Sequence, residues 1–166
     1  MVENEKQFEI ELFREDMKFS VAHFTIFSET NRELLHGHNY RLHVTISAYA
    51  NDNDMVFDYR WYRDKLLQLC RSLDGHCLMP ALSKYLKYKQ TKDEYEFLFT
   101  NQRIILPKAD VLLMPLKNIT TESLAEWFLD KICNEIIEPE NKFINVVSTK
   151  ISSYSGQYAR ISRKIS

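Results

Sequence analysis

Glycine is scarce in this sequence, with three residues among 166, and no glycine-rich loop of the kind that cradles phosphate groups is present. No segment approaches the roughly 18 consecutive apolar residues that a membrane-spanning helix needs. The first ten residues, MVENEKQFEI, lack the basic flank and the apolar stretch of a secretion signal. We therefore expect a cytoplasmic protein that does not associate with a membrane.

An excess of charge of either sign is also absent. The 22 basic and 23 acidic side chains leave a formal net charge of -1, so no long-range field would recruit a nucleic acid. The cysteines, Cys70, Cys77 and Cys133, are odd in number and show no CxxC spacing, which favours neither a disulfide framework nor a thiolate zinc site. We interpret at least two of them as small buried apolar residues. The length and the 45% hydrophobic fraction fit one globular domain over residues 1–166.

Segments rich in aromatic and β-branched residues predict strands at both ends of the chain. Residues 7–27 alternate locally and predict a long or bulged strand pair, and residues 39–50 predict a second strand region. Near the carboxyl end, strands are expected over 143–154 and 157–165, hinged at Gly156. The sequence therefore predicts a sheet built from the two ends of the chain.

Two helices are predicted between these strands. The first begins after Asp58, a helix-capping residue, carries apolar residues at three-and-four spacing, and ends near Gly75. The second begins among residues 120–123, where Ser123 and Glu126 have the spacing of a capping box.

The region between the helices, about 80–118, is less regular. Two strand-like runs, YEFLF and RIIL, are joined by Thr100-Asn101-Gln102 and predict an inserted hairpin within 93–106. The order strands, helix, hairpin, helix, strands is an α+β pattern. Two helices cover only one face of such a sheet, so we expect the other face to be polar or buried against other subunits.

Three histidines form the candidate metal site. His36 and His38 are two residues apart at the start of a strand, so period-two geometry points both imidazoles to one side. His23 lies in the preceding strand region, and the 12 intervening residues suffice to bring it alongside. Three histidines with an open fourth position suit a catalytic zinc ion. The alternative is that the HGH segment is a surface turn and His23 an ordinary core histidine.

Five segments carry a resemblance to a known family: FSVAH (19–23), HGHNY (36–40), MVFDYRWYRDKL (55–66), LDGHCL (73–78) and TTES (120–123). Together they resemble the 6-pyruvoyl-tetrahydropterin synthase family, which includes the 6-carboxytetrahydropterin synthases of queuosine biosynthesis.

The resemblance implies a tunnelling fold, in which a four-stranded antiparallel sheet carries two helices on one face. It implies that three subunits close a barrel and that two trimers stack into a hexamer, with active sites between subunits. It also implies a zinc ion on His23, His36 and His38 and a pterin substrate, 7,8-dihydroneopterin triphosphate.

The residue expected to act as general base departs from the commonest pattern of the family. That pattern has a cysteine shortly before HGH, whereas this sequence has Glu33 there. The resemblance is then to the branch that carries glutamate and yields 6-hydroxymethyl-7,8-dihydropterin, a folate precursor. A carboxylate near a dicationic metal stays ionised and can accept a proton. The alternative is that Glu33 only pairs with Arg32 or a surface lysine.

Two further parts of the family pattern differ here. The relay pair is adjacent in the family, whereas Gly75 separates Asp74 from His76; glycine tolerates a positive φ, so a bend could restore their contact. The last strand of the family offers a glutamate to the pterin, and the matching position is Ser153.

A serine hydroxyl cannot reproduce the paired contact of a carboxylate with two N–H donors. Glu122, beside Thr120 and Thr121, is the candidate replacement in the pterin pocket, although these three residues could simply cap the second helix.

The sequence therefore favours a zinc-dependent lyase with Glu33 as base and the Asp74/His76 pair as relay. One alternative is a synthase of 6-carboxy- or 6-pyruvoyl-pterin that uses another proton acceptor. A second is a homologue that keeps zinc and binds a heterocycle or a partner protein without catalysis.

Overall fold

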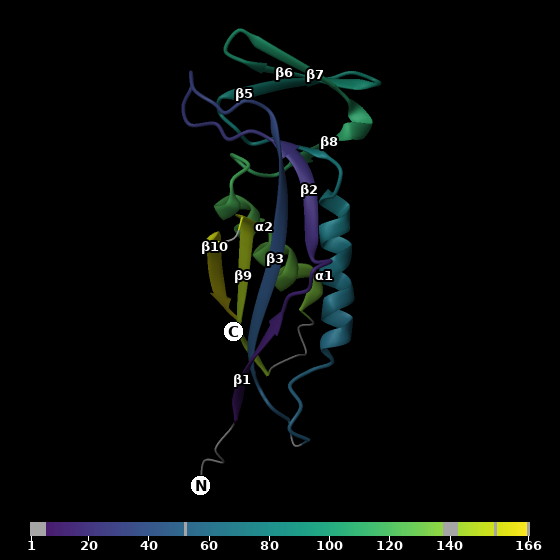
Figure 1. The fold of residues 1–166 in the computed structure, drawn as a ribbon, viewed down its shortest axis with the longest axis vertical. Helices are drawn as coiled ribbons and strands as arrows, with labels where there is room; N and C mark the ends of the chain where they lie inside the picture. The colour runs from purple at the N-terminus through teal and green to yellow at the C-terminus, as the bar shows by residue number, and fades with distance from the viewer. Residues whose placement is uncertain (1–5, 52, 138–142, 155, 166) are drawn as a thin grey trace.

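The computed structural model describes residues 6–51, 53–137, 143–154 and 156–165. A long curved sheet forms the body of the molecule, two helices cover one of its faces, and a smaller sheet lies across one end (Figure 1). Among the described residues no helix is both long and apolar enough to cross a membrane.

The central strand of the main sheet is β3 (His36–Tyr49). Both β1 (Gln7–Leu12) and β2 (Lys18–His23) pair antiparallel with it, one after the other along the same edge. The predicted strand pair is thus two strands that share β3 as partner. On the other side lie β9 (Ile144–Tyr154) and β10 (Gln157–Lys164), all antiparallel. These four strand positions form the expected antiparallel sheet.

The main sheet is larger than the expected four strands, because two short strands extend it beyond β2. They are β4 (Cys77–Pro80) and β8 (Val111–Met114), which run parallel to their neighbours. Each has four residues and is apolar without alternation, so neither shows the period of two that reveals a half-buried strand.

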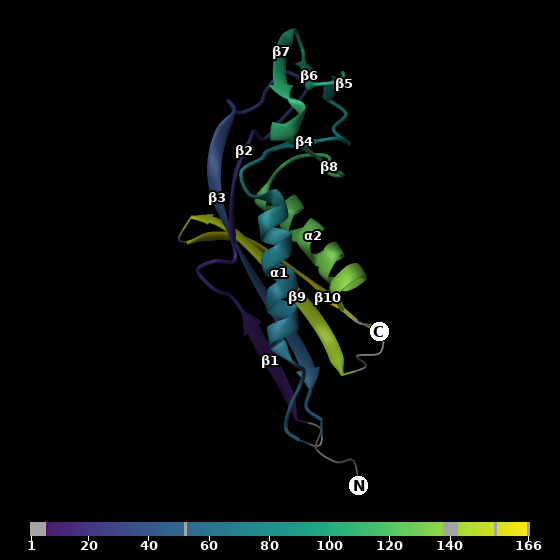
Figure 2. The same ribbon diagram turned by 90° about the vertical axis from the view of Figure 1, so that its right-hand side faces the viewer.

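The first helix is α1 (Tyr59–Leu73); the Asp58 side chain caps it by accepting from the Arg60 N–H, and Gly75 follows it at a φ of 78°. The second is α2 (Thr121–Lys131), continued by the π-helical turn η2 (Ile132–Ile136). Both helices lie on the same face of the sheet (Figure 2).

The capping box of α2 is one turn earlier than predicted. Thr120 is the N-cap residue and Ser123 its reciprocal partner, so the predicted pairing of Ser123 with Glu126 is wrong. The extended backbone of Thr120 decides this, because a cap residue has non-helical φ and ψ.

Alternate residues of β3 produce the two faces of the sheet. Leu42, Val44 and Ile46 are buried and pack with helix residues such as Leu66 and Phe128 in the main hydrophobic core. The uncovered face is polar, as expected, and a hollow of about 570 Å³ on it is lined by residues that include Arg41, His43 and Lys150.

The inserted region forms a separate three-stranded sheet, which we call the small sheet. Its strands are β5 (Leu86–Gln90), β6 (Glu94–Phe99) and β7 (Gln102–Pro107), followed by the short helix η1 (Lys108–Asp110). The predicted hairpin is β6 and β7; β5 was not predicted, because four of its five residues are exposed.

A second apolar cluster fills the space between the small sheet and the main sheet. Phe97 and Phe99 of the small sheet pack there with Met79 and with Phe24, which directly follows β2. The small sheet therefore rests on the segment that leads out of β2, close to the candidate site.

The cysteines behave as small apolar side chains. Cys70 and Cys77 are buried, which confirms the interpretation for two of the three, and Cys133 is half-buried. Burial raises the pKa of Cys70 to about 12 and that of Cys77 to about 11, so neither thiol ionises at neutral pH.

Candidate metal centre and active site

The three histidines come together where β2 ends and β3 begins. His23 is the last residue of β2 and pairs with His36, the first residue of β3, and His38 follows two positions along. The potential ligand atoms of the three side chains all lie within 4.8 Å of one another. This convergence is the arrangement that the spacing predicted.

Backbone carbonyls fix how two of these rings present their nitrogens. Nδ1 of His23 lies 3.2 Å from the carbonyl oxygen of Ile119, and Nδ1 of His36 lies 2.7 Å from that of Leu34. A carbonyl can only accept, so each Nδ1 carries the proton and each Nε2 keeps its lone pair. This is how metal-binding histidines are usually oriented.

The contact with Tyr40 identifies Nε2 as the nitrogen of His23 that carries the lone pair. Its hydroxyl lies 3.0 Å from Nε2 of His23. Burial raises the pKa of Tyr40, with Glu33 and Glu122 adding to the effect, so the hydroxyl stays protonated and donates to that nitrogen. The acceptor at Nε2 agrees with the proton at Nδ1.

Electrostatics favour the neutral forms of His23 and His38. Burial, together with the nearby His36 and His38, lowers the pKa of His23 to about 4. Burial and His36 also lower the pKa of His38. Neutral imidazoles with oriented lone pairs are the ligands that a zinc ion requires, and three of them leave a position for substrate. The residues present thus fit the metal that the sequence predicts.

Glu33 lies beside this centre. Its Oε2 is 3.9 Å from Nε2 of His36 and accepts a hydrogen bond of 2.9 Å from the Thr25 N–H. Partial burial alone would raise the pKa of Glu33, but the Thr25 hydrogen bond and His36 outweigh it and lower the pKa. The alternative pairing with Arg32 is wrong, since the Arg32 guanidinium contacts the carbonyl oxygen of Glu33 and not its carboxylate.

The side chains of the predicted relay pair, Asp74 and His76, contact backbone groups. Oδ1 of Asp74 accepts from the Ser20 N–H at 2.7 Å, and Nδ1 of His76 contacts the backbone carbonyl of Asp74 at 2.9 Å. Among the described residues no ion pair joins the His76 ring to the Asp74 carboxylate.

His76 lines a hollow of about 460 Å³ together with Gly37, His38 and Asn39. Gly37 and Asn39 alternate along β3 with His36 and Tyr40, and His38 borders the hollow as well. Among the described residues, His76 is not part of the three-histidine group.

The start of α2 adjoins the metal centre through Ile119, the residue that orients His23. The Thr120 hydroxyl caps the helix by accepting from the Ser123 N–H, and the Thr121 hydroxyl donates to the carboxylate of the exposed Glu122. Glu122 is close enough to raise the pKa of Tyr40.

Ser153 is half-buried near the end of β9, one step beyond the pairing of Arg41 with Ser152. Ser153 also lines the hollow of about 570 Å³ that includes Asn39 and Arg41. Of the two candidate pterin contacts, Glu122 is the one that lies close to Tyr40.

Three participants in the centre were not predicted. Thr25 and Ile119 act through backbone groups, which leave no signal in a sequence. Tyr40 follows His36 and His38 at the same period of two, so the alternation along the strand could have placed it on the histidine face.

The chain is similar in sequence and in structure to pterin synthases. The family model "6-pyruvoyl tetrahydropterin synthase" matches residues 12–164. A protein from Methanocaldococcus jannaschii, provisionally named 6-carboxy-5,6,7,8-tetrahydropterin synthase, is 26% identical over 86% of this chain and 88% of its own length. The chain therefore belongs to the 6-pyruvoyl tetrahydropterin synthase family.

Solved structures agree with this assignment. The 6-pyruvoyl tetrahydropterin synthase of Plasmodium vivax superimposes with a TM-score of 0.91 at 27% identity, over 96% of this chain and 99% of that one. A variant of the P. vivax protein, in which a glutamate described as a catalytic residue is replaced by alanine, has the same TM-score at 26% identity and the same coverage. The fold is the tunnelling fold of these pterin synthases.

Proposed function

We propose that this chain is a zinc-dependent lyase that converts 7,8-dihydroneopterin triphosphate into 6-hydroxymethyl-7,8-dihydropterin. The observation that carries the proposal is the distance of 3.9 Å between the Glu33 carboxylate and Nε2 of His36. A carboxylate beside the three-histidine centre takes the place of the thiol that the commonest family pattern uses. The catalytic glutamate of the P. vivax relative supports this role.

His23, His36 and His38 would hold the zinc ion, which supplies a Lewis acid toward the side-chain oxygens of the substrate. Glu33 accepts the proton of the second side-chain hydroxyl, counted from the ring. The bond between the first and second side-chain carbons then breaks, and the ring system receives the electron pair. Protonation of the first carbon leaves a hydroxymethyl group, and the second carbon departs as an aldehyde that carries the triphosphate.

The lowered pKa of Glu33 fits this role, because the carboxylate is ionised before substrate arrives. The Thr25 N–H donates to Oε2 and holds the carboxylate beside His36. Tyr40 stays protonated beside the ligands and can hydrogen-bond to a substrate oxygen.

Asp74 and His76 require a second subunit in this proposal. Neither residue is part of the three-histidine group of its own chain, so we propose that they serve the site of a neighbouring copy in a homotrimer or hexamer. The exposed apolar side chains near the centre, Leu34 and Phe27, fit a contact with that neighbour. Glu122 is the proposed anchor for the pterin, and Ser153 is a second candidate contact.

A second candidate product is a 6-carboxy-pterin, which the name of the M. jannaschii relative favours. That reaction needs another proton acceptor, and the buried Cys77, with a pKa of about 11, is a poor one. The non-catalytic alternative predicts tight pterin binding without turnover.

The test is to incubate the zinc-loaded protein with 7,8-dihydroneopterin triphosphate and to identify products by mass. We expect 6-hydroxymethyl-7,8-dihydropterin, and we expect Glu33→Gln to lower kcat by about 10² to 10⁴ fold while zinc stays bound. Glu29→Gln, an exposed glutamate on the same loop, is the control. A 6-carboxy or 6-pyruvoyl product, or a Glu33 variant of undiminished activity, would refute the proposal.

A further inference from the structure

We propose that Arg32 and Gln102 are positioning residues through which the small sheet holds Glu33 at the metal centre. The inference deepens the proposed function, because it rests on Glu33 as the base. It assigns a role to the inserted region, which contributes no ligand to the centre.

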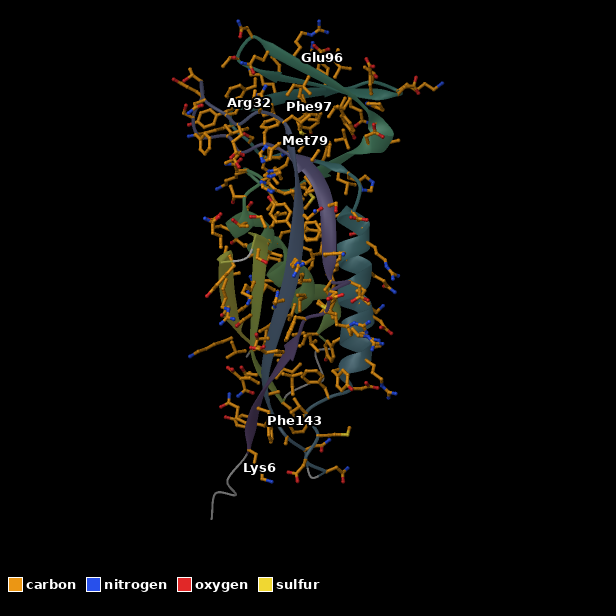
Figure 3. The ribbon with its side chains drawn as sticks, viewed as in Figure 1. Lys6, Arg32, Met79, Glu96, Phe97 and Phe143 are labelled. Atoms are coloured by element: carbon orange, nitrogen blue, oxygen red, sulfur yellow. The ribbon has the colours of Figure 1, made fainter. Side chains whose placement is uncertain are left out.

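A chain of two hydrogen bonds links the base to the small sheet. Nη1 of Arg32 donates to the carbonyl oxygen of Glu33 at 2.7 Å, and Nη2 donates to Oε1 of Gln102 at 2.6 Å. Gln102 is the first residue of β7. One side chain thus spans from the backbone of the base to the edge of the small sheet, and Figure 3 labels Arg32 at the end of the molecule that carries this sheet.

Two aromatic rings hold the guanidinium. Its central carbon lies 4.8 Å from the ring centroid of Phe24 and 5.7 Å from that of Phe99. Phe24 directly follows the ligand His23, and Phe99 belongs to β6, so the rings come from the two parts that Arg32 joins. Cation–π contacts of this kind favour arginine, whose planar fork reaches two acceptors at once.

The arginine is not explained by stability alone. Its Nε is buried and, among the described residues, has no hydrogen-bond partner. An unpaired buried donor costs free energy, which an apolar side chain at this position would avoid. The arginine is therefore explained by the hydrogen bonds that Nη1 and Nη2 donate to Glu33 and Gln102.

Arg32 controls where Glu33 lies and not its charge. The guanidinium binds the carbonyl oxygen of Glu33, while Thr25 binds the carboxylate and also accepts from the Glu33 N–H. The earlier part of the loop is fixed by Asn118, whose side chain donates to and accepts from the backbone of Ile26. With Arg32 removed, the loop loses its hydrogen-bonded link to the small sheet and keeps only apolar contacts such as that of Phe24 with Phe99. A displacement of the base by about 1 Å can lower the rate by roughly 10² fold.

Gln102 offers the cleaner test, because it is exposed and its replacement leaves the core intact. We expect Gln102→Ala to lower kcat about tenfold with KM changed less than twofold, and Gln102→Glu, which keeps the acceptor, to restore the rate. Arg103→Gln removes the neighbouring arginine of β7, which pairs with Glu96 and does not reach the loop, and should leave kcat unchanged. The double variant Arg32→Gln/Gln102→Ala should be no slower than Arg32→Gln alone, because both act through one contact.

Hydrogen exchange gives a readout that does not depend on catalysis. Gln102→Ala should increase exchange over residues 24–34 and leave β3 and β9 unchanged, whereas Arg103→Gln should change neither region. If Gln102→Ala shows this loosening but the wild type has no lyase activity, the positioning holds and the proposed function fails. If the exchange of residues 24–34 is the same in Gln102→Ala and the wild type, the positioning role is refuted whatever the activity.

Discussion

The carbonyl oxygen of Ile119 lies 3.2 Å from Nδ1 of His23, so the residue that precedes the cap of α2 also orients a candidate metal ligand. The start of this helix and the end of β2 therefore act as one unit. A substitution at either position should therefore change the orientation of the His23 ring.

Zinc binding should depend on the three clustered histidines and on no other histidine. We expect His38→Ala to lower zinc affinity by at least about 10² fold, because one of three protein ligands is lost. His76→Ala should leave the affinity unchanged, since His76 is not part of the three-histidine group. Competition with a chromogenic chelator measures both, and equal losses in the two variants would contradict the ligand set.

The cap of α2 should contribute measurable stability. Thr120→Ala removes the acceptor for the Ser123 N–H, and we expect a loss of about 1 kcal/mol in the free energy of unfolding. Thr121→Ala, one residue inside the helix, should change it by less than about 0.5 kcal/mol. Urea denaturation of both variants checks this. Equal stability of the Thr120 variant and the wild type would mean that Thr120 is not a structural cap.

The metal-free protein should lose stability in acid because of His23. The pKa of His23 is about 4 in the folded chain, against the ordinary value of 6.5 that applies in the unfolded chain. Between these values the unfolded chain binds more protons than the folded one, so stability is complete above pH 6.5 and falls as the pH drops toward 4. The difference corresponds to about 3 kcal/mol.

Urea denaturation across this pH range, with chelator present, measures the effect. His38 contributes in the same direction, because its pKa is also lowered. In His23→Gln the fall between pH 6.5 and 4 should be much shallower. A slope that is the same in His23→Gln and the wild type would assign the acid sensitivity to other groups.

The proposed division of the site between subunits predicts complementation. Glu33→Gln and His76→Ala should each be nearly inactive alone. When the two variants are unfolded and refolded together, mixed oligomers should regain activity, because some sites then receive an intact Glu33 from one copy and an intact His76 from another. Mixtures that are never refolded together are the control, and an absence of recovery in the mixed oligomers would show that both residues act within one chain.

The fold was predictable wherever the sequence has a clear period. Leu42, Val44 and Ile46 alternate with polar residues, and they give β3 its buried face. Asp58 and Gly75 mark the two ends of α1 as expected. By contrast, β4 and β8 are short and apolar throughout, and β5 is mostly exposed, so none of the three produces a period that could be recognised.

The candidate site was predictable for side chains that share one strand and not for those joined through space. His36 and His38 follow from the period of two, and His23 from the length of the loop. The position of Glu33 beside His36 depends on a hydrogen bond from the Thr25 backbone. Which face His76 occupies depends on how the chain turns at Gly75, which has no signature beyond the glycine itself.

The proposed ligands and the proposed base belong to structurally separate parts of the molecule. The histidines are on paired strands of the main sheet, whereas Glu33 is on the loop between them, hydrogen-bonded through Arg32 to the small sheet. On this proposal, substitutions in the loop can exchange the acid–base group without changing the three histidines. Such a scaffold allows one ligand set to be reprogrammed toward different reaction products, and the loop, not the strands, is the place to engineer them.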